Sequence, residues 1–305
     1  MGKRELCAYC SDTFKGLFTR YGYGVSNQRT LYEYTGYINL LCEYIKKDFL
    51  DIEDADADSY MSYMLNKVSE GSLTRQTVCV RLSCYKAVSR FVDELDEIDG
   101  YYNAFEKVHR PEIRTYELNP AKIPTLKELD AVMSAAKADP KYYLILALAT
   151  RVGLTVTNIV NIKRNCVIEE NGRLFIYIPP ANDFRSERYV MLPQDVQKLM
   201  ESYLADYKQD DSGYIFINRN KNPLTIRNID SAVSKYIKAS GIDKHYTMKD
   251  LRTRAILELV EAGADPDVIG EYTGLRRMRV NAFVNSSGLV SGTCPADLVN
   301  YQIRA

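Results

Sequence analysis

The residues best suited to chemistry are cations in the last fifth of the chain. Lys249 and Arg252 are three residues apart, so a helix would place both on one face. Lysine stays protonated at neutral pH, and a guanidinium can donate two parallel hydrogen bonds to phosphate oxygens. This pair is therefore suited to binding an anion rather than to transferring a proton. Further positive charge follows nearby, at Lys244, Arg254, Arg276, Arg277 and Arg279. The alternative for residues 276–279 is a charge run that only faces solvent.

Other reactive side chains are scarce. The chain has two histidines, His109 and His245, which excludes mechanisms that need several. Its seven cysteines are odd in number and scattered, which is typical of free thiols in a reducing compartment. Cys7 and Cys10 have the only metal-like spacing, and no second pair follows, so a zinc or redox role is the weaker alternative. We therefore expect no metal ion and no cofactor.

Composition sets the scale of the fold. A chain of 305 residues, 46 % apolar and 26 % charged, favours two globular domains and excludes wholesale disorder. The formal net charge of zero argues against coating nucleic acid by bulk charge but leaves room for a local basic face. No apolar run approaches the ~20 residues that span a bilayer, and the N-terminus lacks a signal-peptide core. We expect a cytoplasmic protein.

The elements that would position these cations fall into two parts. Residues 1–112 predict a helical domain, with helices over 26–47, around Tyr60 to Val68, and over 74–95, and with an acidic loop at 51–58. A proline-containing stretch without periodicity at 113–121 predicts a linker.

Residues 122–305 predict a second, mostly helical domain. Thr125 and Glu128 form a capping-box pattern at its first helix. Two strand-like runs, 173–178 and 187–192, predict a small antiparallel sheet. Helices are expected over 125–138, 141–151, 155–163, 193–207, 225–240, 249–262 and 267–272.

Four stretches in this order resemble the tyrosine recombinases, the phage integrase family. They are SLTRQTVCVRLSCYKAVSRFV (72–92), VGLTVTNIVNIK (152–163), KNPLTIRNIDSAVSKYIKASGI (221–242) and YTMKDLRTRAILELVEAGADPDVIGEYTGL (246–275). The resemblance covers nearly the whole chain. It implies a mainly α fold, in which a helical core-binding (SAM-like) domain precedes a catalytic-type domain with a small antiparallel sheet. It also implies double-stranded DNA as the partner and a role in DNA recombination or integration.

The resemblance assigns six catalytic positions, of which this chain keeps one. The family uses two arginines, a lysine, a histidine, a further histidine or tryptophan, and a nucleophilic tyrosine. The retained position is Arg252, the second arginine. The others fall, in chain order, on Thr155, Asp183, Lys249, Leu275, and Phe283 or Val284. Without a tyrosine no tyrosyl–DNA bond can form, so the residues argue against the chemistry that the fold implies.

The leading hypothesis is a catalytically deficient homologue, a pseudoenzyme that clamps duplex DNA between two domains to regulate transcription or assist a mobile element. One alternative is an active recombinase that relocates its site to Arg151, Arg185, Arg252 and Tyr301; Tyr272 and His245 are weaker substitutes. A second alternative is a protein-interaction module, which the zero net charge and the acidic stretch at 51–58 favour.

DNA contacts are expected from the cations described above, with Arg252 as a vestigial phosphate contact. Weaker candidates in the same domain are Arg185, Arg188 and Arg227. In the helical domain, Arg75, Arg81 and Lys86 are candidates for a major groove. The tail, residues 286–305, is a candidate for self-association on DNA, as the resemblance implies.

Overall fold

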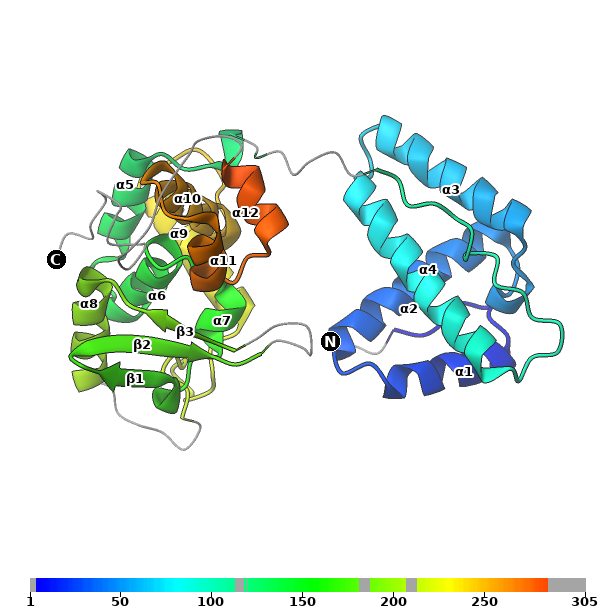
Figure 1. Ribbon diagram of the computed structural model, residues 1–305, viewed down its shortest axis with the longest axis horizontal. Helices are drawn as coiled ribbons and strands as arrows, with labels where there is room; N and C mark the ends of the chain where they lie inside the picture. Colours follow the sequence, from blue (N-terminus) through cyan, green and yellow to red (C-terminus); the bar gives the residue numbers. More distant parts are fainter. Residues whose placement is uncertain (1–3, 113–117, 119, 181–186, 207–212, 285–305) are drawn as a thin grey trace. The chain divides into compact units, whose positions relative to one another are not determined.

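A computed structural model describes residues 4–112, 118, 120–180, 187–206 and 213–284 (Figure 1). The chain forms two compact units, Met1–Arg114 and Thr115–Ala305, each with a buried apolar core of its own. Helices dominate both units, and the second also contains a three-stranded antiparallel sheet. The predicted fold class is therefore confirmed.

Four helices build the first unit. They are α1 (Asp12–Tyr23), α2 (Gln28–Ile45), α3 (Asp54–Ser69) and α4 (Arg75–Leu95). The helices predicted over 26–47 and 74–95 are confirmed to within two residues at each end. Thr74 caps α4 by accepting a hydrogen bond from the Thr77 N–H, and Val78, Leu82 and Tyr85 are buried on its apolar stripe.

The acidic stretch at 51–58 is not the loop that we predicted. Phe49–Asp51 forms a 3₁₀ turn, and Asp54 begins α3. The carboxylates of Asp54 and Asp56 lie in the first helical turn, where the exposed N–H groups and the helix dipole favour negative charge. Lys47 pairs with Asp56 at 2.7 Å. The carboxylates therefore serve the helix start.

The second unit surrounds one apolar helix. Its helices are α5 (Leu126–Ala136), α6 (Pro140–Thr150), α7 (Val156–Val160), α8 (Gln194–Ala205), α9 (Ile226–Ala239), α10 (Met248–Glu261), α11 (Pro266–Thr273) and α12 (Arg277–Val284). Every residue from Tyr143 to Thr150 is buried, so α6 lies in the core and other elements pack around it. The predicted capping box between Thr125 and Glu128 is present at the start of α5.

The sheet has the order β1 (Val167–Glu170), β2 (Arg173–Ile178) and β3 (Arg188–Met191) (Figure 1). The two predicted strand runs are β2 and β3, and Ile176 pairs with Val190 on the buried face. We did not predict β1, because only Val167 of its four residues is buried and the alternation that marks a strand is missing.

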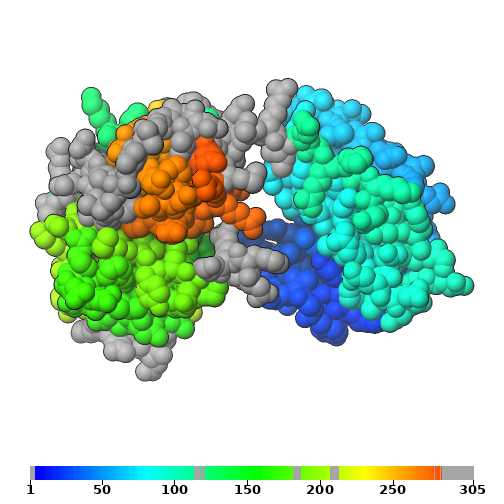
Figure 2. All heavy atoms as spheres, viewed as in Figure 1, coloured from blue at the N-terminus to red at the C-terminus, as the bar shows by residue number. Residues whose placement is uncertain are grey.

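A last helix follows the residue at which we expected the helices to end. Gly274 closes α11 in the left-handed conformation, with φ 71°, and α12 begins three residues later. The orange surface of α11 and α12 adjoins the green surface of the strands (Figure 2), and α11 packs against β3. Residues 276–279, which we interpreted as a possible charge run, thus span the start of α12. Val280 and Phe283 of this helix are buried.

Candidate functional site

The turn between α6 and α7 leads to Thr155, on which the resemblance places the first catalytic arginine. Gly153 has φ 74°, and a Cβ there would lie 3.3 Å from the Thr273 methyl group, so a side chain at this position would be strained and crowded. Thr155 caps α7: its hydroxyl accepts from the Asn158 N–H at 3.1 Å and donates to Asn158 Oδ1 at 2.7 Å. A capping hydroxyl therefore occupies the position at which the family has an arginine.

Arg252 reaches back from α10 to this turn. Its Nε donates to the Gly153 carbonyl at 2.6 Å, and its Nη2 donates to the Thr273 carbonyl at 2.8 Å. The half-buried guanidinium thus joins α10 to the turn before α7 and to the end of α11. Hydrogen bonds from a charged donor to otherwise unsatisfied carbonyls stabilise this arrangement.

Lys249 lies one helical turn before Arg252 and is exposed. Within the described part of the chain it forms no ion pair. Asp250, its neighbour, is committed to the capping box of α10, where it accepts from the Thr247 N–H and hydroxyl at 2.8 and 2.7 Å. The predicted pair on one face of a helix is therefore present, with the ammonium group outward.

The last two lost positions are apolar and lie against the core. Leu275 packs on the core just after the Gly274 turn. Phe283 on α12 is 4 % exposed and belongs to the same core. The side chain of Val284 and all of Asp183 lie outside the described residues. The resemblance places the nucleophile at Phe283 or Val284, and neither side chain carries a hydroxyl.

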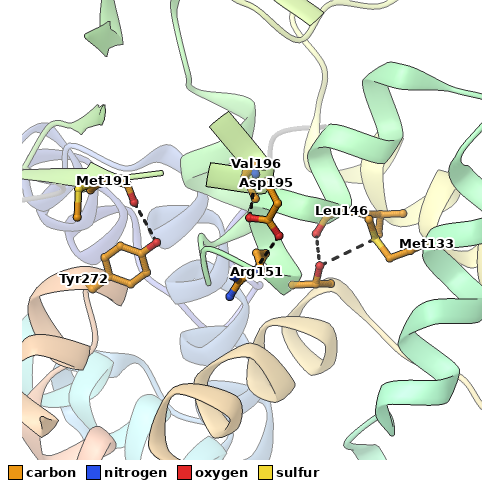
Figure 3. A network of polar contacts seen from close by, with 8 residues as sticks. Met133, Leu146, Arg151, Met191, Asp195, Val196 and Tyr272 are labelled. Atoms are coloured by element: carbon orange, nitrogen blue, oxygen red, sulfur yellow. Dashed lines mark hydrogen bonds and ion pairs between the residues drawn. The ribbon is translucent and has the colours of Figure 1, made fainter. Parts of the chain in front are cut away.

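Two nearby substitutes have structural partners (Figure 3). Arg151 is buried, and its Nε donates to Asp195 Oδ2 at 2.9 Å, so it does not face solvent at the end of α6. The Tyr272 hydroxyl donates to the Met191 carbonyl at 3.0 Å and is 7 % exposed, which ties α11 to β3. Arg185 and Tyr301 lie outside the described residues, and His245 is exposed.

Arg188 received little weight from sequence, yet it lies at the site. From β3 its Nη2 donates to Asn158 Oδ1 at 3.3 Å, and its guanidinium lies against Gly274, where a Cβ would overlap it. No local sequence signal indicates this contact, because Asn158 and Arg188 are thirty positions apart.

Two of the predicted cations near Lys249 and Arg252, namely Lys244 and Arg254, form ion pairs with carboxylates. Arg254 pairs with Glu258 and with Glu261 on its own helix, and its side chain is 17 % exposed. Lys244 pairs with Glu128 at 2.9 Å. Arg254 lies two positions after Arg252 on α10, and residues two positions apart point to different sides of a helix. Arg254 is therefore not part of the surface that Lys249 and Arg252 form.

The three arginines around the start of α12 are exposed. Arg277 pairs with Asp267 at 3.2 Å across exposed side chains. Arg276 and Arg279 are also exposed. Cations at a helix N-terminus oppose the helix dipole, so this placement costs stability by itself. Arg227, at the start of α9, is exposed as well.

The three α4 candidates have intramolecular partners. Arg75 Nη1 donates to the Glu112 carbonyl at 3.1 Å, and Lys86 Nζ donates to the Glu106 carbonyl at 2.9 Å. Arg81 is half-buried, with its guanidinium 5.8 Å from the Tyr37 ring centre. In this structure Arg75 and Lys86 hold the segment after α4 along the helix, a role that sequence reasoning missed.

No cluster of three or more metal-ligating side chains occurs among the described residues. The Sγ atoms of Cys7 and Cys10 lie 3.8 Å apart, and the six cysteines of the described part are free. Within the same part of the chain, no helix combines the length and the apolar character needed to cross a membrane.

Comparisons with known proteins agree with this architecture. Residues 124–281 match the model of the phage integrase family. The chain is 23 % identical to "Tyrosine recombinase XerC" of Leptospira interrogans over 81 % of this chain and 79 % of that protein, and 24 % identical to the protein of the same name from Lacticaseibacillus casei over 74 % and 76 %.

Solved structures share the fold. The chain is similar to XerH site-specific recombinase bound to a palindromic difH substrate, with a TM-score of 0.66, 15 % identity, and coverage of 94 % of this chain and 96 % of that one. It is also similar to a lambda integrase tetramer bound to a Holliday junction, with a TM-score of 0.60, 16 % identity, and coverage of 86 % and 76 %. The family model matches more than half of the chain, so the protein belongs to the phage integrase family, that of the tyrosine recombinases.

Proposed function

We propose that this chain binds duplex DNA through a phosphate contact at Arg252 and Lys249 and does not cleave it. The observation that carries the proposal is the placement of two cationic side chains on α10. Lys249 points an unpaired charge outward, within the described structure, one turn from a rigidly held guanidinium. Exposed cations beside preorganised hydrogen-bond donors are what a DNA backbone contact requires.

The exposed arginines at the start of α12 extend this basic surface. Arg276, Arg277 and Arg279 are exposed around the start of α12, where a polyanionic partner would meet their positive charge. Structural neighbours of this fold are recombinases bound to DNA, which supports the same partner. We propose further that both units contact one duplex and that copies associate on it through the tail; regulating transcription or assisting a mobile element would follow from such binding.

Loss of strand cleavage rests on the nucleophile. The resemblance assigns that position to Phe283 or Val284, and neither side chain has a hydroxyl that could attack a phosphodiester. The first arginine and the further histidine are also replaced, by Thr155 and Leu275. Removing one donor to a transition state costs ~10²–10³ in rate in other enzymes, so these losses reinforce the main one.

The test of binding is its dependence on salt. The apparent affinity of the full chain for a duplex containing its binding sequence, selected from a random pool, should fall steeply as salt rises. Lys249→Gln should reduce the slope of log affinity against log salt by about 1, whereas Lys198→Gln, which removes an exposed lysine of α8, should leave it unchanged. Binding indifferent to salt, or no binding at low salt, would overturn the proposal and favour a protein-interaction module.

The test of chemistry is a nicked suicide duplex that traps any covalent intermediate. We expect no protein–DNA adduct on denaturing gels. An adduct that disappears in Tyr301→Phe would establish the active alternative with a relocated tyrosine. That alternative must dispense with Arg151, whose guanidinium is buried beside Asp195.

A further inference from the structure

A second guanidinium lies at the site from a different element. Arg188 is on β3, where it pairs with Ile178 of β2, and its side chain crosses to α7 and to the end of α11. Its Nη2 donates to Asn158 Oδ1 at 3.3 Å. Its Nη1 occupies space that only a glycine at 274 leaves open, since a Cβ there would overlap it. The absence of a side chain at Gly274 therefore admits this cation.

The two guanidinium groups lie against consecutive residues at the end of α11. Arg252 Nη2 donates to the carbonyl of Thr273, and Arg188 lies against Gly274, the next residue. The carbonyl end of α11 carries partial negative charge, which accounts for part of this attraction. Both guanidinium groups carry positive charge in a half-buried place, so a phosphate that reaches both would be attracted by each of them.

Arg188 is also linked to the lost arginine position. Asn158 Oδ1 accepts from the Arg188 guanidinium and from the Thr155 hydroxyl at 2.7 Å. Thr155 stands where the resemblance places the first arginine. The charge that is absent from the start of α7 is thus supplied one hydrogen bond away, from β3.

We propose that Arg188 and Arg252 together form a phosphate-binding site, in which Arg188 replaces the arginine lost at Thr155. The inference rests on the proposed function and names the residue that completes its phosphate contact. Its ligand is a phosphodiester of duplex DNA. Strand pairing holds the backbone of Arg188, and Asn158 orients the guanidinium, so little side-chain freedom remains to be lost on binding.

The experiment compares variants of the full chain on the selected duplex. Arg188→Gln should lower affinity about tenfold and reduce the salt slope by about 1. Arg164→Gln, which removes an exposed arginine just before β1, is the matched control and should bind as the parent does. Asn158→Ala keeps every charge but releases the guanidinium, so affinity should fall about threefold with the salt slope unchanged, as expected for lost orientation without lost charge. Circular dichroism and thermal unfolding establish that each variant is folded.

A double variant tests whether the two arginines share one phosphate. If they do, Arg188→Gln combined with Arg252→Gln should weaken binding by clearly less than the product of the single effects. If Arg188→Gln binds as Arg164→Gln does while Lys249→Gln still reduces the salt slope by about 1, the inference fails and the proposed function stands. If the parent chain itself shows no salt-dependent binding, the proposed function fails, and this inference with it.

Discussion

Glu128 on α5 makes the stability of the second unit depend on pH. Burial of its carboxylate raises the pKa, but hydrogen bonds override that effect: the Thr125 N–H donates at 2.8 Å, Lys244 lies at 2.9 Å and the Tyr246 hydroxyl donates at 3.0 Å. Together they hold the pKa of Glu128 at about 2, below its ordinary value of 4.5. These partners favour the ionised carboxylate only in the folded chain.

The sign and size of the effect follow from linkage. Because the folded pKa is lowered, the stabilisation is fully present above the unfolded value of 4.5 and is lost as the pH falls from there toward about 2. At about 1.4 kcal/mol for each pH unit, the shift corresponds to roughly 3 kcal/mol. Lys244 is 57 % exposed and therefore screened by solvent, so we expect an observed effect of about 2 kcal/mol.

The perturbation is Glu128→Gln, measured by urea unfolding from pH 7 down to pH 3. The free energy of unfolding of the variant should be about 2 kcal/mol lower at pH 7, and the difference from the parent should shrink below pH 4.5. Glu271→Gln, at an exposed glutamate of α11, is the control and should follow the parent at every pH. A Glu128→Gln difference that stays constant from pH 7 to pH 3 would refute the reasoning.

Three further changes probe the framework of the site. Asp195→Ala removes the carboxylate that pairs with the buried Arg151 and should cost about 3–5 kcal/mol in thermal or urea unfolding. The apolar pair Arg151→Met with Asp195→Leu should recover most of this loss, and equal losses in both variants would argue against a buried charge as the cause. Gly153→Ala forces a positive φ on an alanine beside the Thr273 methyl group, so it should lower the free energy of unfolding by about 1–2 kcal/mol in urea. A variant more stable than the parent would show that the turn does not require a glycine. Tyr272→Phe removes the hydrogen bond to β3 and should cost about 1 kcal/mol in urea unfolding without altering DNA affinity; a large change in affinity would instead give Tyr272 a role at the interface.

Sequence patterns predicted the elements whose signals are local. The capping box of Thr125 and Glu128, and the apolar stripe of α4, each depend on residues within a few turns of one another. The predictions that failed concern elements whose sequences carry no distinctive local pattern. Asp54 and Asp56 were interpreted as a loop because acidic residues are common both in loops and at helix starts. β1 was missed because only one of its four residues is buried, so it shows no alternation.

The candidate site was predicted only in part, because the partners of a charge lie far away in sequence. Lys249 and Arg252 on one helix face follow from helical spacing alone. That Arg254 is paired follows from helical spacing too, through Glu258 and Glu261, and could have been found. By contrast, no local pattern indicates that Arg188 meets Asn158, thirty positions away.

The sequence by itself determined what this chain lacks. A tyrosine is absent from the position that the family resemblance assigns to the nucleophile, and no folding can restore a hydroxyl to Phe283. Only the tertiary structure decided which cations remain available, since electrostatic interactions depend on distance and burial rather than on order along the chain. It buried Arg151 beside Asp195, and it brought Arg188 from β3 to Asn158, which also accepts a hydrogen bond from Thr155.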